Sequence, residues 1–148
     1  MMCAALTISG CGLFKKKPKP PPEPTYVTLN FEASGDINRN ISGSASPVVL
    51  RIYQLKSYTT FEKADFFSLF EEDDQLLGKD LLDKEEILLK PHEKKTVFFE
   101  PSEETEAIGL FAVFREYKEA QWKASVGIRK NKTNVIDVTV SGFELITR

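Results

Sequence analysis

Cys11 is the residue whose chemistry bears most on the nature of this protein. A cysteine here can be a free thiol, half of a disulfide with Cys3, a metal ligand, or a point of covalent attachment. A disulfide framework needs cysteines within the fold, and no cysteine follows Cys11. A zinc site takes about four ligands, and His92 is the single histidine. Covalent attachment therefore explains the cysteine best.

The residues before Cys11 indicate the kind of attachment. Residues 1–10, MMCAALTISG, are uncharged and apolar and end in small side chains, which is typical of the last part of a secretory signal peptide. The tetrapeptide ISGC resembles the lipobox of bacterial lipoproteins, in which the cysteine is acylated and becomes the new N-terminus. The resemblance implies cleavage after Gly10 and identifies residues 1–10 as a signal-peptide remnant. The basic start of such a signal is missing, so we expect the start codon upstream of Met1; a cytosolic protein with an ordinary apolar N-terminus is the alternative.

Residues 11–24 are interpreted as the lipidated cysteine and a Pro/Lys-rich tether. The stretch KKKPKPPPEP favours extended polyproline geometry at ~3.1 Å per residue, a standoff of roughly 40 Å. A single acyl chain anchors only marginally, and bacterial lipoproteins carry several, such as palmitate. The lysines can add attraction to an anionic membrane surface or simply solvate the linker. Gly12 stands where aspartate commonly marks inner-membrane retention, so the resemblance implies an outer-membrane lipoprotein on the periplasmic face.

Residues 25–148 have the size of one folded domain. Outside residues 11–24 the chain has 16 basic and 21 acidic residues, a net charge of −5, which argues against a nucleic-acid partner. No apolar run approaches the roughly 18 residues of a membrane span. We therefore expect the outer-membrane contact to be made by lipid on Cys11.

Two polar groups in the domain could be imagined as catalytic or metal-binding. The consecutive carboxylates 71–74 lack the spaced ligands and the glycine of a calcium loop, so we expect a solvated surface patch. His92 follows Pro91 in an expected turn, where a lone histidine is usually exposed, and no nucleophile motif accompanies it. We predict no catalytic residue, no metal and no cofactor besides the covalent lipid.

The hydrophobic pattern of the domain predicts an all-β, two-sheet β-sandwich. Apolar and polar side chains alternate over seven or eight short segments separated by turn signals. A short helical insertion is expected between the second and third strands, opened by Asp65 and stopped by Gly78. The third and fourth strands flank the residues PHE and are expected to pair as a hairpin. The predicted strands cover residues 25–33, 48–55, 81–90, 94–100, 107–117, 121–128 and 135–147, the last being one strand or a pair broken near Gly142.

The segment between the first two strands, residues 34–47, is unusually long. Its sequence SGDINRNISGSASP contains two glycines, two asparagines and four serines and has no periodicity. Loops longer than about 12 residues without structure of their own are usually functional or disordered. Asn38, Arg39 and Asn40 offer a polar tip, and Ile41 offers one apolar anchor.

The order of motifs resembles the TssJ family, outer-membrane lipoproteins of the type VI secretion system. The similarity lies in SPVVLRIYQLKS, FEKADFFSLFEED, LLGKDLL, LKPHE and IGLFAVFREYKEAQWK, and it spans residues 26–126. It implies a transthyretin-like sandwich with an added helical segment. It also implies a structural, non-enzymatic role in a multi-subunit membrane complex, in which the loop between strands 1 and 2 binds the periplasmic C-terminal domain of TssM, an inner-membrane protein.

The resemblance places the partner-binding loop at residues 34–46. Ser44 stands where the family commonly has arginine, so a contact made by that arginine is not carried over. A mobile surface loop without a partner is the plain alternative. The residues expected to contact TssM are Asn38, Arg39, Asn40, Ile41, Ser42 and Gly43.

Two other functions would show different features. An enzyme would need polar groups converging around His92. A periplasmic lipoprotein that binds a small ligand or glycan would need aromatic residues exposed in a shared cleft. The aromatic residues to examine for such a cleft are Tyr53, Tyr58, Tyr117 and Trp122.

Overall fold

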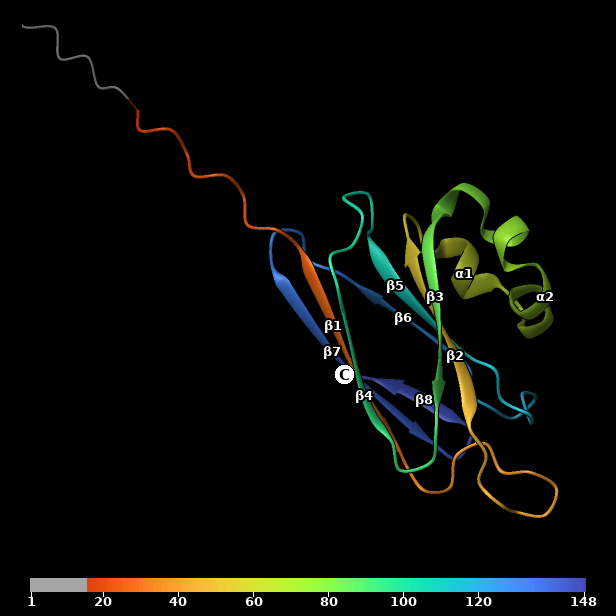
Figure 1. Ribbon diagram of the computed structural model, residues 1–148. Coiled ribbons are helices and arrows are strands. Elements are labelled where there is room, and N and C mark those ends of the chain that lie inside the picture. The colour runs from red at the N-terminus through yellow and green to blue at the C-terminus, as the bar shows by residue number, and fades with distance from the viewer. Residues whose placement is uncertain (1–15) are drawn as a thin grey trace, which may run out of the picture.

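Two four-stranded sheets pack face to face in the structure, a computed structural model that describes residues 16–148 (Figure 1). Residues 1–15, with the predicted signal-peptide remnant and Cys11, lie outside the described residues. The strand orders are β4-β1-β7-β8 and β3-β2-β5-β6. This confirms the predicted sandwich with its helical insertion. The elements are β1 (Tyr26–Ala33), β2 (Val48–Leu55), α1 (Thr59–Lys63), α2 (Phe66–Leu77), the single turn η1 (Gly78–Asp80), β3 (Leu81–Leu89), β4 (Lys94–Phe99), β5 (Ala107–Ala112), β6 (Lys123–Gly127), β7 (Thr133–Ser141) and β8 (Glu144–Thr147).

The space between the sheets is filled by alternate side chains of the strands. In β1, Val27, Leu29 and Phe31 are buried, while the residues between them face outward. Each such burial stabilises the fold by ~1.5–3 kcal/mol, so the period-two pattern of the sequence is also the pattern of its stability. The other buried residues of this core include Leu50, Ile52, Ile108, Leu110, Ile136, Val138 and Val140.

The central strands β2 and β5 are covered on both faces. Their outward side chains pack under α1 and α2, which lie on the outer surface of this sheet (Figure 1). All six residues of β5 are buried for this reason. In β2, apolar residues such as Tyr53 and Leu55 on the outward face match this double coverage. This second core contains Tyr53, Leu55, Phe61, Phe66, Leu69, Leu77 and Phe111.

Helix α2 begins and ends where the sequence indicates. The Asp65 carboxylate accepts a hydrogen bond from the Ser68 amide at 3.0 Å and satisfies one free N–H of the first turn. Gly78, at a φ of 51°, follows the last turn. The helix kinks at Glu72, whose φ of −135° is not helical. Helix α1 begins after Tyr58 without a side-chain cap.

The predicted hairpin of the third and fourth strands is wrong. Strand β3 pairs with β2 in one sheet and β4 pairs with β1 in the other, so the turn at residues 90–93 crosses from sheet to sheet. Ile87 and Val97 still reach the same core, but from opposite sides of it. The alternation of apolar and polar residues determines which face of a strand is buried, but it does not specify the strand with which it pairs. The pattern is therefore compatible with a hairpin and with a crossing between the sheets.

Strand β5 is shorter than predicted. It ends at Ala112, where the chain turns with a hydrogen bond from the Phe114 amide to the Ala112 carbonyl at 2.9 Å. The residues that follow form a loop whose Tyr117 ring stacks on Phe66 of α2 with centroids 4.6 Å apart. Of the apolar residues after Ala112, Val113 and Tyr117 therefore pack against the helical insertion, whereas Phe114 stays in the core between the sheets.

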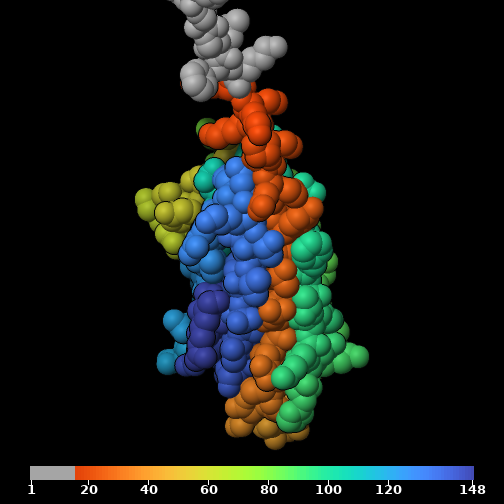
Figure 2. All heavy atoms as spheres, turned by 90° about the vertical axis from the view of Figure 1, so that its left-hand side faces the viewer, coloured from red at the N-terminus to blue at the C-terminus, as the bar shows by residue number. Residues whose placement is uncertain are grey.

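The tether and the long loop leave the domain at opposite ends. Figures 1 and 2 show the chain entering β1 at one end of the sandwich, whereas residues 34–47 lie at the other. At the tether end, the Asn131 amide donates to the Thr25 hydroxyl at 2.8 Å. At the loop end, the Asn38 amide donates to the Gly142 carbonyl at 2.9 Å. Strand β1 thus runs from the tether to the loop.

Candidate functional site

The loop of residues 34–47 is held at its base by three neighbouring segments. The Ser34 amide donates to the Val140 carbonyl at 2.9 Å, and the Ser34 carbonyl accepts from His92 in the β3–β4 turn at 3.3 Å. The bond between Asn38 and Gly142 adds the β7–β8 turn. Because these contacts tie the base of the loop to the first sheet and to the turn that links the two sheets, the base has a defined position.

Asn38 holds the loop together from inside. It is only 3% exposed, and its Nδ2 donates to the Pro47 carbonyl at 2.9 Å while its Oδ1 accepts from the Arg115 amide at 2.9 Å. Its φ of 47° lies in the left-handed region, where asparagine is favoured over most residues. Of the six predicted contact residues, Asn38 therefore positions the loop and offers no surface of its own.

The neck of the loop also contributes to the core. Ile37 is fully buried, and its carbonyl accepts from the Ser46 amide at 3.0 Å, which closes the two sides of the neck. Replacing the whole loop by a tight turn would delete this core side chain. The segment available to a partner is thus the tip, residues 39–45.

The tip is shaped by hydrogen bonds around Asn40. Its amide donates to the Ser44 carbonyl at 2.8 Å, and its Oδ1 accepts from the Ser44 amide at 3.0 Å. Gly43 donates to the Asn40 carbonyl at 2.9 Å and has a φ of 81°, which a glycine adopts without strain. Ile41 and Ser42, between these residues, are exposed, and Ile41 has a relative exposure of 105%. The tip presents one large apolar side chain on a defined turn.

Charged groups flank the tip. Arg39 lies 3.6 Å from the Asp36 carboxylate, and both side chains are largely exposed. Hydrogen bonds from the Ser34 hydroxyl and the Gly142 amide hold the pKa of Asp36 below its usual range, and Arg39 lowers it further. Asp36 therefore stays ionised and is engaged in hydrogen bonds within the loop region, while Arg39 faces solvent beside Ile41.

His92 does not form a catalytic cluster with described residues. Its ring lies against Gly35, where an added Cβ would stand 2.2 Å from a ring carbon. The ring makes no hydrogen bond to another described residue, and its backbone φ is 62°. The contact explains why glycine occupies position 35, and it assigns His92 to packing of the loop base.

The four aromatic residues considered for a ligand cleft do not share a surface. Tyr53 is fully buried, and its hydroxyl donates to Asp73 at 3.0 Å. Tyr117 and Trp122 both pack on Phe66 of α2, leaving Tyr58 as the exposed member of the four. The arrangement is that of a packed second core.

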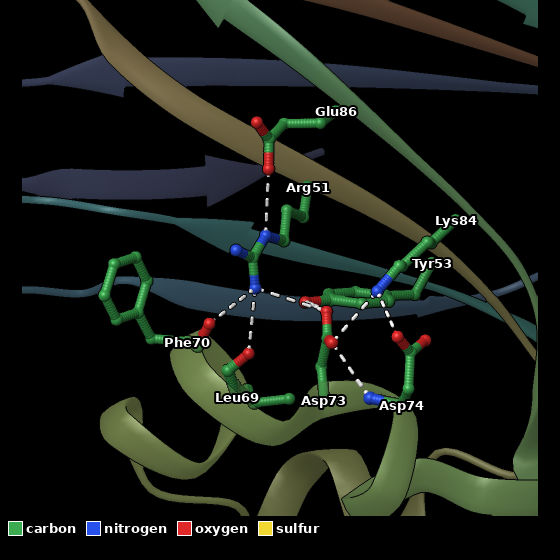
Figure 3. A network of polar contacts seen from close by, with 8 residues as sticks. All are labelled: Arg51, Tyr53, Leu69, Phe70, Asp73, Asp74, Lys84 and Glu86. Carbon is green, nitrogen blue, oxygen red and sulfur yellow. Dashed lines mark hydrogen bonds and ion pairs between the residues drawn. The ribbon is translucent and has the colours of Figure 1, made fainter.

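Asp73 contradicts the expectation of a solvated acidic patch at residues 71–74. Its side chain is 8% exposed and lies in the network of Figure 3, 3.2 Å from Arg51 and 3.0 Å from Lys84. Burial opposes its ionisation, but hydrogen bonds from Lys84 and Tyr53 outweigh this and keep the pKa of Asp73 below its usual range. The other three carboxylates of the run are exposed as predicted.

Arg51 connects this network to the kink of α2. Its Nη1 donates to the carbonyls of Leu69 and Phe70 at 3.0 and 3.1 Å, directly before the non-helical Glu72 (Figure 3). A kink removes the usual helical partners of such carbonyls, and the guanidinium replaces them. The network therefore fixes the helical insertion to β2.

Two further properties of residues 16–148 bear on the site. None of the helices in this part of the chain is long and apolar enough to cross a membrane. No three or more His, Cys, Asp or Glu side chains of these residues are grouped so that they could hold a metal ion.

The sandwich with its small helical part is the fold of a known family of proteins. A family model described as type VI secretion lipoprotein, with VasD, EvfM and TssJ among its names, matches residues 25–142. The chain belongs to the type VI secretion lipoprotein family. The family consists of structural lipoprotein components, not enzymes, and implies a membrane-anchored location.

Solved structures support the membership. The crystal structure of the lipoprotein TssJ1 from Pseudomonas aeruginosa has a TM-score of 0.81 and 30% identity, over 84% of this chain and 95% of that one. A chain in a structure of a type VI membrane complex has a TM-score of 0.74 and 27% identity, over 83% and 97%. A chain in a structure described as the TssM C-terminal domain (869–1107) from EAEC has a TM-score of 0.69 and 26% identity, over 83% and 97%. No curated protein sequence matches the chain.

Proposed function

We propose that this type VI secretion lipoprotein is acylated on Cys11, faces the periplasm from the outer membrane, and binds the periplasmic C-terminal domain of TssM through residues 34–46. Membership of the family and the likeness to chains in secretion-complex structures support the proposal. The protein then acts as a tether: lipid supplies membrane affinity, and the loop supplies specificity for the partner.

Ile41 is the observation that carries the proposal. A fully exposed isoleucine on a turn held by backbone hydrogen bonds contributes nothing to folding, yet it can bury its whole side chain against a partner. The loop lies at the end of the sandwich opposite to the tether, so it points away from the anchored end (Figure 1). Arg39, Ser42 and Gly43 surround Ile41 with exposed polar groups.

The loop contact is tested by Ile41→Asp in a binding measurement with the TssM C-terminal domain. Loss of ~1.5–3 kcal/mol of apolar burial predicts a Kd about 10- to 150-fold weaker, with an unchanged melting temperature. Phe98→Asp is the matched control, because Phe98 is an exposed apolar residue of β4 that lies opposite Thr28, near the tether end of the sandwich. Equal binding by Ile41→Asp and the parent would remove the tip from the interface.

The anchor is tested separately by Cys11→Ser. The variant is expected to fold normally and to bind the TssM C-terminal domain as the parent does. It is also expected to move from the membrane fraction to the soluble periplasm. Mass spectrometry of membrane-extracted parent protein should find an acylated N-terminal cysteine. A free thiol on Cys11 in that material would exclude the lipid anchor.

A further inference from the structure

One edge of the first sheet is open near the tether end of the domain. Strand β8 pairs with β7 only from Val138 to Ser141, and the last contact is the exchange of two backbone hydrogen bonds between Asp137 and Arg148, at 3.1 and 2.9 Å. Figure 2 shows β8 beside the lower part of β7 alone. The upper part of β7 therefore has a partner strand, β1, on one side only.

The open edge displays unpaired backbone groups. Alternate residues of a strand direct their N–H and C=O groups to the same edge. Since Asp137 faces β8, Val135 and Thr133 face the same side beyond its end, and no other described residue forms a hydrogen bond with their backbone there. Two N–H and two C=O groups are thus available to an added strand, which is the way that many proteins capture extended peptides.

The surroundings of this edge are cationic and partly apolar. A depression of about 290 Å³ runs along it, lined by Arg129, Lys132 and Arg148 and by no acidic residue. None of these three cations forms an ion pair with another described residue. Val135 adds an apolar side chain that is 59% exposed. The cations stand out because the chain as a whole has a negative net charge.

We propose that the β7 edge at Thr133–Ile136 binds an extended acidic segment of a protein partner, which adds a strand in line with β8. Backbone groups of the edge supply directional hydrogen bonds, and the three cations select acidic side chains. A second copy of this chain is disfavoured, because two edges with the same charge repel each other. This surface lies away from the loop at residues 34–46 and is independent of it (Figure 1).

The probe for this site is a short synthetic peptide of alternating glutamate and valine, and the protein is the full chain with Cys11→Ser. Fluorescence anisotropy of labelled peptide should show saturable binding that weakens with added salt, since the attraction between exposed charges decays over about 10 Å at 0.1 M salt and over shorter distances at higher salt. The amides of Thr133 and Val135 should become protected from hydrogen exchange. A peptide of alternating lysine and valine should bind at least about tenfold more weakly.

Two variants separate the backbone from the charges. Val135→Pro removes an N–H that faces the open edge and no bond to β1, so the fold should persist while peptide affinity falls about tenfold. Lys132→Glu should lower the affinity by a similar factor, whereas Lys118→Glu, an exposed charge in the loop after β5, should not. Any one of three results overturns the proposal: no binding of the acidic peptide, equal binding of both peptides, or unchanged binding by Val135→Pro. Self-association through this edge would identify a second copy as the occupant and would also overturn it.

Discussion

Replacing Asp73 by alanine should destabilise the domain far more than its place in an acidic run suggests. The carboxylate is 8% exposed and accepts from Arg51, Tyr53 and Lys84. Its removal leaves the Tyr53 hydroxyl buried without an acceptor, at a cost of ~1–3 kcal/mol. Arg51 loses one anion but keeps Glu86 and two helix carbonyls, so the loss is below the ~3–5 kcal/mol of a fully buried, broken pair.

The unpaired Tyr53 hydroxyl and the weakened ion pair of Arg51 together predict a loss of about 3 kcal/mol in the free energy of unfolding. This is equivalent to roughly 10 °C in melting temperature for a domain of this size. Urea unfolding followed by tryptophan fluorescence measures it, because Trp122 packs beside the second core. Asp74→Ala is the matched control: its side chain is 74% exposed and pairs with the same Lys84, so a loss within ~0.5 kcal/mol is expected. Equal losses for the two variants would refute the assignment of a buried network.

Three other predictions concern the loop base and the response to acid. Asn38→Ala should cost ~2–3 kcal/mol in urea unfolding, because the Arg115 amide and the Pro47 carbonyl lose their partner; a cost below ~0.5 kcal/mol would contradict this. Gly35→Ala should destabilise by about 1 kcal/mol through overlap with the His92 ring, and the loss should shrink in the His92→Ala background; an equal loss in both backgrounds would show that the ring is not the obstacle. The pKa of Asp73 is lower in the folded than in the unfolded protein, so the stability that its ionised carboxylate provides is complete above its ordinary pKa of ~3.9. That stability is lost as the pH falls from there through the lower pKa of the folded state. The parent should therefore lose stability over this acidic range more steeply than Asp73→Asn.

The extent of the sequence-based prediction differs between elements for identifiable reasons. The bounds of β2, residues 48–55, were predicted correctly because turn residues flank an apolar run. Helix α2 has an N-terminal aspartate cap and a glycine after its last turn, both local signals. The pairing of β3 and β4 was wrong, since a short turn is compatible with a hairpin and with a crossing between sheets.

The candidate site shows the same division between local and long-range information. The exposure of Ile41 follows from its place at the tip of a polar loop, whereas the burial of Asn38 depends on Arg115 and Pro47, which pattern alone does not bring together. Asp73 had a signal that was overlooked. It lies four residues after Leu69 and seven after Phe66, on the buried face of α2, so helical spacing and not the local charge run decides its environment.

The course of β1 determines how a pulling force would pass through the domain. This one strand starts at Tyr26, beside the tether, and ends at Ala33, directly before the loop proposed to hold TssM. It is hydrogen-bonded to β4 on one side and to β7 on the other. Traction between membrane and partner would therefore be carried by the covalent backbone of this one strand, and its hydrogen bonds to β4 and β7 would not have to break. The helices and the second sheet lie outside that line of force and can stay undeformed while the connection is under tension.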